Sequence, residues 1–395
     1  MRSLVNTTLE IDDFETAAEV LLAGVGDEFK LEDNTLGVLI CYSDMECEEL
    51  ALFIQEKVNF DVIGCTAIAS MDHKSGFQEM SASFTVLTTD DCKFNIGISE
   101  PITIDNAQDQ VKKTYNKIKE QMEDEAKLLI AIPPYILEVM LDEYPMALNE
   151  AAPGVPIIGG LPSYNANGDV NYVLMNGNVY EDRMVLVAVS GNIQPVFSVQ
   201  NVTSKDSSRK RKVTKSDKNV IYQVGDQKFT DYLEEVGFSL DNLLDGNNTI
   251  RFVSNPLLLE SAGKYSFART LHEIDPEKGT GTAIGRIPND ALISVCSLER
   301  NQIEEAAVDG IRELKEKIKE QEASGYHYST VIAISCIGRH LLMLPNGEVE
   351  VNRLLTEFPE GYTLSGFYSY GEIGPQGEEQ SRNFAHNESL ILCAI

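Results

Sequence analysis

The chain has 395 residues, and its 62 acidic against 32 basic side chains give a formal net charge of −30. A field of that sign repels nucleic-acid phosphates and anionic lipid surfaces, so we expect neither nucleic-acid binding nor membrane insertion. Hydrophobic residues make up 43% of the chain and charged residues 24%, which is the composition of a folded globular protein and not of a disordered one.

The N-terminal segment and the cysteines predict a cytoplasmic protein. The opening MRSLVNTTLEIDDF has neither the apolar core nor the cleavage site of a signal peptide. The seven cysteines are odd in number and lie mostly in apolar runs such as VLICYS and LILCAI, which is typical of reduced, buried thiols. Because no CxxC pair occurs and the five histidines are scattered, we expect no metal site. We also expect no cofactor, since there is no GxxxxGK[ST] motif and GTGTAIG (279–285) lacks the strand–loop–helix context of a dinucleotide site.

Three segments of the chain share one pattern, in which an apolar strand is expected to end at a glycine and is followed by a loop and a second apolar strand. They span residues 61–89, 155–191 and 363–395, with Gly64, Gly159 and Gly366 at corresponding places. Glycine at such a place fits a sharp exit or a close approach of two backbones.

A strand, a helix and another strand precede each segment. The lead-ins are SLVNTT, a helix at 12–24 and LGVLICYS; FNIGIS, a helix at 105–122 and KLLIAIP; and ALISVCS, a helix at 301–322 and TVIAIS. The last helix places Ile303, Ala307, Ile311, Leu314 and Ile318 on one face. We therefore predict an α/β fold of repeated strand–helix–strand–helix–strand–strand units, with mixed sheets covered by helices and two domains.

An insertion at roughly 195–290 separates the second unit from the third. Its basic opening, SKDSSRKRKVTKSDK (204–218), fits either an arm for nucleic acid or anions, or an exposed linker or hairpin tip, and the strongly acidic chain favours the linker or hairpin tip. We expect a strand, a turn and a short helix from Asn219 onward, and strands in IRFVSNPLLLE and YSFARTLHEID. The predicted domains are 1–200, with two units, and 201–395, with the insertion and the third unit.

Polar side chains gather after the apolar strands of the third unit, at the edge where open α/β sheets present ligand-binding loops. The segments SCIGRH (335–340), GFYSYGEIGP (366–375) and SRNFAHNES (381–389) supply them. The candidate ligand-binding residues are Cys336, Arg339, Tyr368, Tyr370, Glu372 and Asn387.

The chemistry of this cluster suits a small zwitterion. A guanidinium binds a carboxylate through two hydrogen bonds and a carboxylate holds an ammonium, so Arg339 and Glu372 could bracket an amino acid or a related small carboxylate. Alternatively, Arg339 and Glu372 form an ion pair with each other.

Two other functions stay open at this point. Cys336 is either a small buried residue or the nucleophile of a cysteine-dependent enzyme with His340 or His386 as base. A third alternative is a scaffold without a pocket, whose acidic surface binds a basic partner. We assign no catalytic residue.

These same residues resemble the FIST family of sensory domains. Its C-terminal domain is matched by Cys336-Ile-Gly-Arg339, by Gly366 to Pro375 and by His386-Asn387, and the segment around Arg269 matches more loosely. Its N-terminal domain is matched by Ile63-Gly64-Cys65-Thr66 and by residues 156–160. The resemblance implies sensing of a small ligand. Family members often accompany kinase, cyclase or chemoreceptor modules, and because this sequence holds only the paired domains, we expect it to signal through a partner protein.

Overall fold

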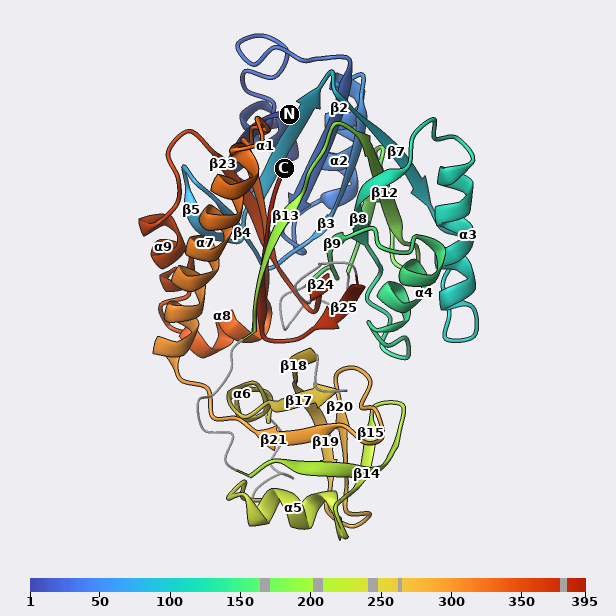
Figure 1. Ribbon diagram of the computed structural model, residues 1–395. Coiled ribbons are helices and arrows are strands. Elements are labelled where there is room, and N and C mark those ends of the chain that lie inside the picture. Colours follow the sequence, from blue (N-terminus) through green and yellow to red (C-terminus); the bar gives the residue numbers. More distant parts are fainter. Residues whose placement is uncertain (164–170, 202–208, 241–247, 262–264, 377–381) are drawn as a thin grey trace.

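The computed structural model describes residues 1–163, 171–201, 209–240, 248–261, 265–376 and 382–395, and Figure 1 shows their arrangement. Three similar α/β units form the larger body, drawn above, and the insertion forms a smaller body below it. Within the described residues, no helix combines the length and the hydrophobicity that a membrane crossing requires.

The first two units have the same order of elements. The first consists of β1 (Arg2–Thr8), α1 (Phe14–Leu21), β2 (Asn34–Cys41), α2 (Cys47–Lys57), β3 (Asp61–Thr66), β4 (Ala69–Asp72), β5 (Gly76–Glu79) and β6 (Ala82–Thr89). The second consists of β7 (Cys92–Ile98), α3 (Ala107–Lys119), β8 (Ala126–Ile132), α4 (Glu143–Ala151), β9 (Ile157–Gly160), β10 (Val173–Met175), β11 (Asn178–Tyr180) and β12 (Val185–Gly191).

The third unit repeats this order with one additional short helix. It consists of β13 (Val196–Asn201), α7 (Arg300–Glu322), β22 (Thr330–Cys336), α8 (Ile337–Met343), α9 (Val349–Thr356), β23 (Thr363–Ser369), β24 (Glu372–Gln376), β25 (Arg382–His386) and β26 (Ser389–Ala394). The predicted apolar face of α7 is confirmed, since Ile303, Ala307, Ile311, Leu314 and Ile318 are all buried.

Each unit builds the same four-stranded sheet, in which two antiparallel pairings lead to a pair of parallel strands at one end. The strand orders are β1-β6-β2-β3, β7-β12-β8-β9 and β13-β26-β22-β23. Each unit then sends a hairpin to the sheet of another unit: β4-β5 joins β23, β10-β11 joins β3, and β24-β25 joins β9. The predicted α/β fold of repeated units is confirmed, and the exchange of hairpins ties the three units into one body.

The repeated glycines allow the two parallel strands of each unit to pair closely. In each unit the strand continues beyond the glycine, so the predicted end of the strand there is wrong. The close approach of two backbones, and not a sharp exit, explains the glycine. In the parallel ladders the pairs are Gly64 with Leu39, Gly159 with Ala131 and Gly366 with Ala333. A Cβ on these glycines would lie 1.7, 2.2 and 1.9 Å, respectively, from the carbonyl oxygen of the paired residue. Any side chain there would force the two strands apart.

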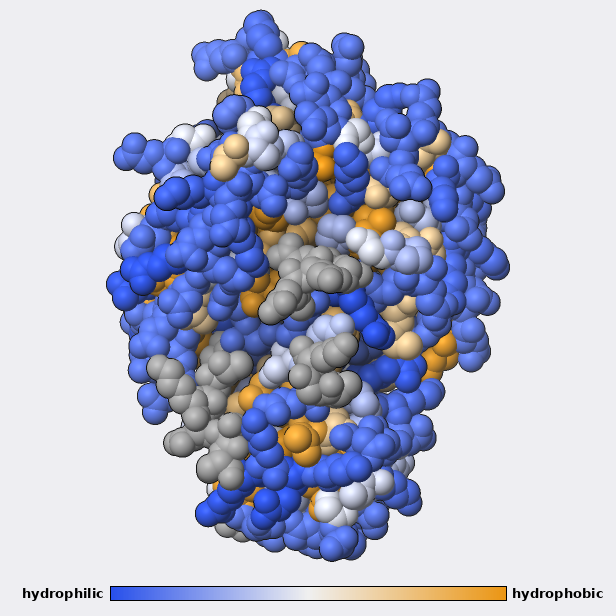
Figure 2. Space-filling model, viewed as in Figure 1, coloured by the Kyte–Doolittle hydropathy of each residue, from blue (hydrophilic) through white to orange (hydrophobic). Residues whose placement is uncertain are grey.

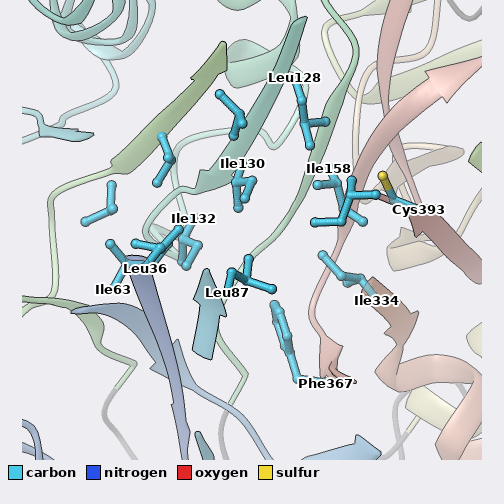
Figure 3. Packing of buried hydrophobic residues seen from close by; sticks show 14 of the residues in the cluster. Leu36, Ile63, Leu87, Leu128, Ile130, Ile132, Ile158, Ile334, Phe367 and Cys393 are labelled. Carbon is cyan, nitrogen blue, oxygen red and sulfur yellow. The ribbon is translucent and has the colours of Figure 1, made fainter. Parts of the chain in front are cut away.

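The largest apolar core lies where the three sheets meet. Figure 3 shows its side chains, with Leu36 and Leu87 from the first unit, Ile130 and Ile158 from the second, and Ile334 and Phe367 from the third. Burial of these side chains stabilises the contact between the units. The surface seen in Figure 2 is, by contrast, mostly hydrophilic, as the charge of the chain leads one to expect.

The insertion folds around a core of its own. It contains β14 (Arg211–Asp217), β15 (Val220–Val224), β16 (Gln227–Lys228), α5 (Phe229–Glu235), α6 (Thr249–Ser254), β17 (Leu257–Ser261), β18 (Tyr265–Arg269), β19 (Leu271–Asp275), β20 (Thr280–Ala283) and β21 (Leu292–Val295). The predicted strand, turn and short helix after Asn219 are confirmed as β15 and α5.

Two local predictions for the insertion are wrong. ALISVCS provides β21 of the insertion sheet, and the first strand of the third unit is β13, so the insertion interrupts that unit. The ALISVCS stretch and β13 are both short and apolar. Only the pairing of β13 with β26 shows which of the two strands belongs to the third unit. The start of IRFVSNPLLLE is helical, in α6. The basic stretch continues as the largely exposed strand β14, which forms a hairpin with β15. Residues 202–208 of that stretch lie outside the described residues. The domain division at residue 200 stays a prediction.

Candidate functional site

Arg339 belongs to a buried hydrogen-bond network centred on the Glu350 carboxylate. Its Nε atom donates to Glu350 Oε1 at 2.7 Å, and its Nη2 atom donates to the same oxygen. The other oxygen of Glu350 accepts hydrogen bonds from Ser335 Oγ at 2.8 Å and from the Tyr368 hydroxyl at 2.9 Å. The side chains of Arg339 and Glu350 are 0% and 1% exposed, respectively. Charge and hydrogen-bonding capacity are therefore satisfied within the protein, and the network fixes α8 to α9 and β23.

The prediction that Arg339 and Glu372 together hold a zwitterion is wrong. The alternative prediction, an ion pair between Arg339 and Glu372, is wrong as well. The carboxylate that binds Arg339 is Glu350, on α9. Glu372 is fully buried, and its Oε2 atom accepts a hydrogen bond of 2.8 Å from Ser389 Oγ, while its Oε1 atom has no partner. Burial, together with the nearby Glu388 carboxyl, holds the pKa of Glu372 well above its usual value.

A cleft of about 150 Å³ lies beside this network, between the insertion and the third unit. Helix α6 and strand β19 form one side, and α8 with the turn between β25 and β26 forms the other. Three of the six predicted residues line it: Cys336, Tyr370 and Asn387. Arg339, Tyr368 and Glu372 do not. The apolar part of the wall consists of Phe252, Val253, Leu271, Ile284, Ile337 and Leu341.

Glu388 also lines this cleft, and it is not among the residues predicted from the sequence. Its side chain is buried, Oε1 accepts a hydrogen bond of 2.9 Å from Thr270 Oγ1, and Oε2 has no partner. Its backbone has φ +54°, a left-handed conformation that is costly for a residue with a side chain. Gly338 makes room for it, since a Cβ there would lie 2.4 Å from Oε1.

A second unsatisfied acceptor lies next to Glu388. Asn387 is buried, and its Oδ1 atom has no hydrogen-bond partner, although its Nδ2 atom donates to the His386 carbonyl at 3.1 Å. Buried polar atoms are normally hydrogen-bonded, so two unsatisfied acceptors in one cleft indicate a place for a donor. Tyr370 packs at the edge, with its ring centroid 5.4 Å from that of Tyr135.

Cys336 is a buried thiol in this environment. Burial is the largest cause that raises its pKa well above the usual value, and the neighbouring Glu372 and Glu388 raise it further. The ring of His386 contacts the Gly374 carbonyl, and that of His340 stacks on Phe77. Among the described residues, no hydrogen bond joins Cys336 to either histidine. The raised pKa and the absence of a base beside the thiol favour the small buried residue over the nucleophile.

The pKa of Glu388 predicts a pH dependence of stability. Burial raises this pKa from 4.5 to about 7. Folding then favours the protonated carboxyl, so its contribution is complete below pH 4.5 and is lost as the pH rises through about 7. We expect wild type to lose on the order of 3 kcal/mol relative to Glu388→Gln across this window. Urea unfolding of both proteins at pH 5 and pH 8 measures the difference, and parallel pH profiles would contradict the assignment.

The described residues contain no group of three or more His, Cys, Asp or Glu side chains that could hold a metal ion. A comparison with curated proteins finds no match. Two solved structures, PurL of T. maritima complexed with ATP and phosphoribosylformylglycinamidine synthase II from Thermotoga maritima, each align with 99% of this chain and 71% of their own. Both are 7% identical to it, with a TM-score of 0.19, which is too low to carry an argument.

Comparison with protein families gives a clear result. The FIST N domain matches residues 35–227, and the FIST C domain matches residues 230–375. The second range includes Cys336 and the segment from Gly366 to Pro375, on which the resemblance in the sequence depends. Together the two ranges cover most of the described fold, including all three parallel strand pairs. The chain therefore belongs to the FIST family and contains its paired sensory domains, FIST N and FIST C.

Proposed function

We propose that this FIST protein senses a small molecule that carries an amino group, amino acids included, and that it binds this molecule in the cleft beside Glu388. The observation that carries the proposal is the Glu388 carboxyl, which is buried at the cleft with one oxygen unsatisfied. Its left-handed backbone supports the proposal, because strain of this kind persists mainly where function requires it.

The chemistry of the wall favours an amine over a simple carboxylate. An ammonium group offers three donors, and Glu388 Oε2 and Asn387 Oδ1 are two acceptors without partners. The apolar side chains opposite them suit a short hydrocarbon body. The described residues that line the cleft include neither lysine nor arginine, so His272 is the one side chain among them that could pair with a carboxylate. This narrows the amino acids and small carboxylates expected from the sequence to molecules with an amino group.

The position of the cleft supports a role in signalling. A bound molecule would contact the insertion through α6 and β19 and the third unit through α8, and Thr270 already joins the two through its hydrogen bond to Glu388. We propose that ligand binding tightens this contact and that a partner protein recognises the tightened form. A cytoplasmic location fits the seven cysteines, all of which are buried thiols.

A thermal-shift screen of the full chain tests the proposal. The library contains amino acids, primary amines and the matching carboxylates without an amine. A ligand at about a hundred times its dissociation constant adds roughly 2.7 kcal/mol of stability, which is a measurable shift. We expect amines to stabilise wild type and not Glu388→Gln, while Glu320→Gln, on the exposed face of α7, behaves like wild type.

The pH dependence of the hit sharpens the test. An ammonium requires the ionised carboxylate, so its affinity should fall about tenfold per pH unit below the Glu388 pKa of about 7. Stabilisation by carboxylates alone, or an amine response that persists in Glu388→Gln, would overturn the proposal. A library without any hit would favour the scaffold that binds a basic partner. Selective alkylation of Cys336 near neutral pH would favour the cysteine-dependent enzyme.

A further inference from the structure

A second and larger cleft lies on another part of the contact between the insertion and the main body. It has a volume of about 710 Å³, within the range of small-molecule sites, and it lies between α4, β18 and β25. It shares none of its described lining residues with the Glu388 cleft. The two clefts can therefore be tested independently.

One wall of this cleft is aromatic. The half-buried ring of Phe384 lies 4.7 Å from the Tyr265 ring and 5.7 Å from the Phe267 ring, measured between centroids. Phe384 comes from β25 and the other two rings from β18, so the wall is continuous across the contact between the two bodies. Such a wall suits a planar ring, which gains both burial and favourable ring–ring geometry there.

Among the described residues around the cleft, each charged side chain except one arginine forms an ion pair with a side chain of opposite charge. Arg269 binds Asp142 at 3.0 Å, Arg286 binds Glu143, and Glu150 binds Lys112. Arg382 has no carboxylate partner among the described residues, and its guanidinium carbon lies 5.5 Å from the centroid of the Phe384 ring. Arg286 also retains a buried Nε atom without a hydrogen-bond partner. A local excess of positive charge and an unsatisfied donor are thus present on a chain with a net charge of −30.

We propose that this cleft is a second ligand site, for a small planar aromatic anion. The ring would lie against Phe384 and Tyr265, and the anionic group would accept hydrogen bonds from Arg382 and from Arg286 Nε. This cleft offers hydrogen-bond donors and positive charge, whereas the Glu388 cleft offers hydrogen-bond acceptors. The two sites would therefore bind different ligands. The assignment does not depend on the function proposed for Glu388.

Titration of the full chain with 8-anilinonaphthalene-1-sulfonate, an anion with a planar naphthalene ring whose fluorescence rises on binding, tests this site. We expect saturable binding that weakens about tenfold in Arg382→Gln, because a hydrogen bond to a charged group is lost. Arg353→Gln, an exposed arginine of α9, and Glu388→Gln are the matched controls and should bind like wild type. Melting curves verify that Arg382→Gln stays folded, as its exposure leads us to expect.

N-phenyl-1-naphthylamine, which has the same ring system without the sulfonate, separates anion recognition from general hydrophobic binding. We expect it to bind more weakly than the sulfonate to wild type and equally to wild type and Arg382→Gln. Equal affinity of the sulfonate for wild type and Arg382→Gln would overturn the proposal. Equal affinity of wild type for the two probes would overturn it as well.

Discussion

Glu350→Gln is expected to destabilise the protein by about 3 to 5 kcal/mol, the cost of breaking a buried ion pair by removing one partner. Arg339 would remain fully buried without a counter-charge, and Ser335 and Tyr368 would donate to a weaker acceptor. Equilibrium unfolding in urea measures the loss. Since the network joins α8, α9 and β23, the loss of stability should affect the whole third unit.

Glu316→Gln is the control for this experiment, because this glutamate lies on the exposed face of α7 and should change stability by less than about 0.5 kcal/mol. If Glu350→Gln cost no more than the control, Arg339 would not depend on Glu350. The structural role of the network would then be wrong, and Arg339 would again be a candidate for binding a ligand carboxylate.

Gly64→Ala is expected to cost at least about 3 kcal/mol, the upper end of the penalty for overpacking. The added Cβ would lie 1.7 Å from the Leu39 carbonyl oxygen, which belongs to the paired backbone and cannot rotate away as a side chain does. Gly366→Ala should behave in the same way, with its Cβ 1.9 Å from the Ala333 carbonyl oxygen. Thermal and urea unfolding of the purified variants measure both effects.

Gly361→Ala provides the matched control, since its backbone has φ +84° but an added Cβ meets nothing within 4 Å. It should cost only the strain of the left-handed conformation, about 1 to 2 kcal/mol. Equal losses for Gly64→Ala and Gly361→Ala would contradict the claim that close strand pairing explains the repeated glycines.

The repeated architecture could be predicted because it leaves a local pattern in the sequence. Each unit repeats its apolar strands, and Gly64, Gly159 and Gly366 recur at the same place in each. The exchange of hairpins between units could not be predicted, since β4, β10 and β24 differ in sequence and nothing local specifies which sheet edge a strand joins. The assignment of β21 to the third unit failed for the same reason.

The candidate site could be predicted only in part. The end of β22, the turn after β23 and the turn after β25 do meet, which placed Cys336, Tyr370 and Asn387 at one cleft. The partner of Arg339 was missed because Glu350 lies in VEVNRLLT, where a charged residue of an amphipathic helix is usually exposed. Glu388 was missed because a glutamate in a turn normally faces solvent, and no feature of HNES indicates that its side chain is buried.

Because the chain contains no tryptophan, binding of a ligand in the Glu388 cleft can be measured directly with one introduced indole. Leu341→Trp places a single indole on the half-buried wall of the Glu388 cleft, and its fluorescence can be followed while the best amine is added. We predict a saturable change at pH 8 that is absent when Glu388→Gln is added to the same variant. An amine that stabilises this single-tryptophan protein without any change in indole fluorescence would bind elsewhere, and it would contradict the assignment of this cleft as the sensory site.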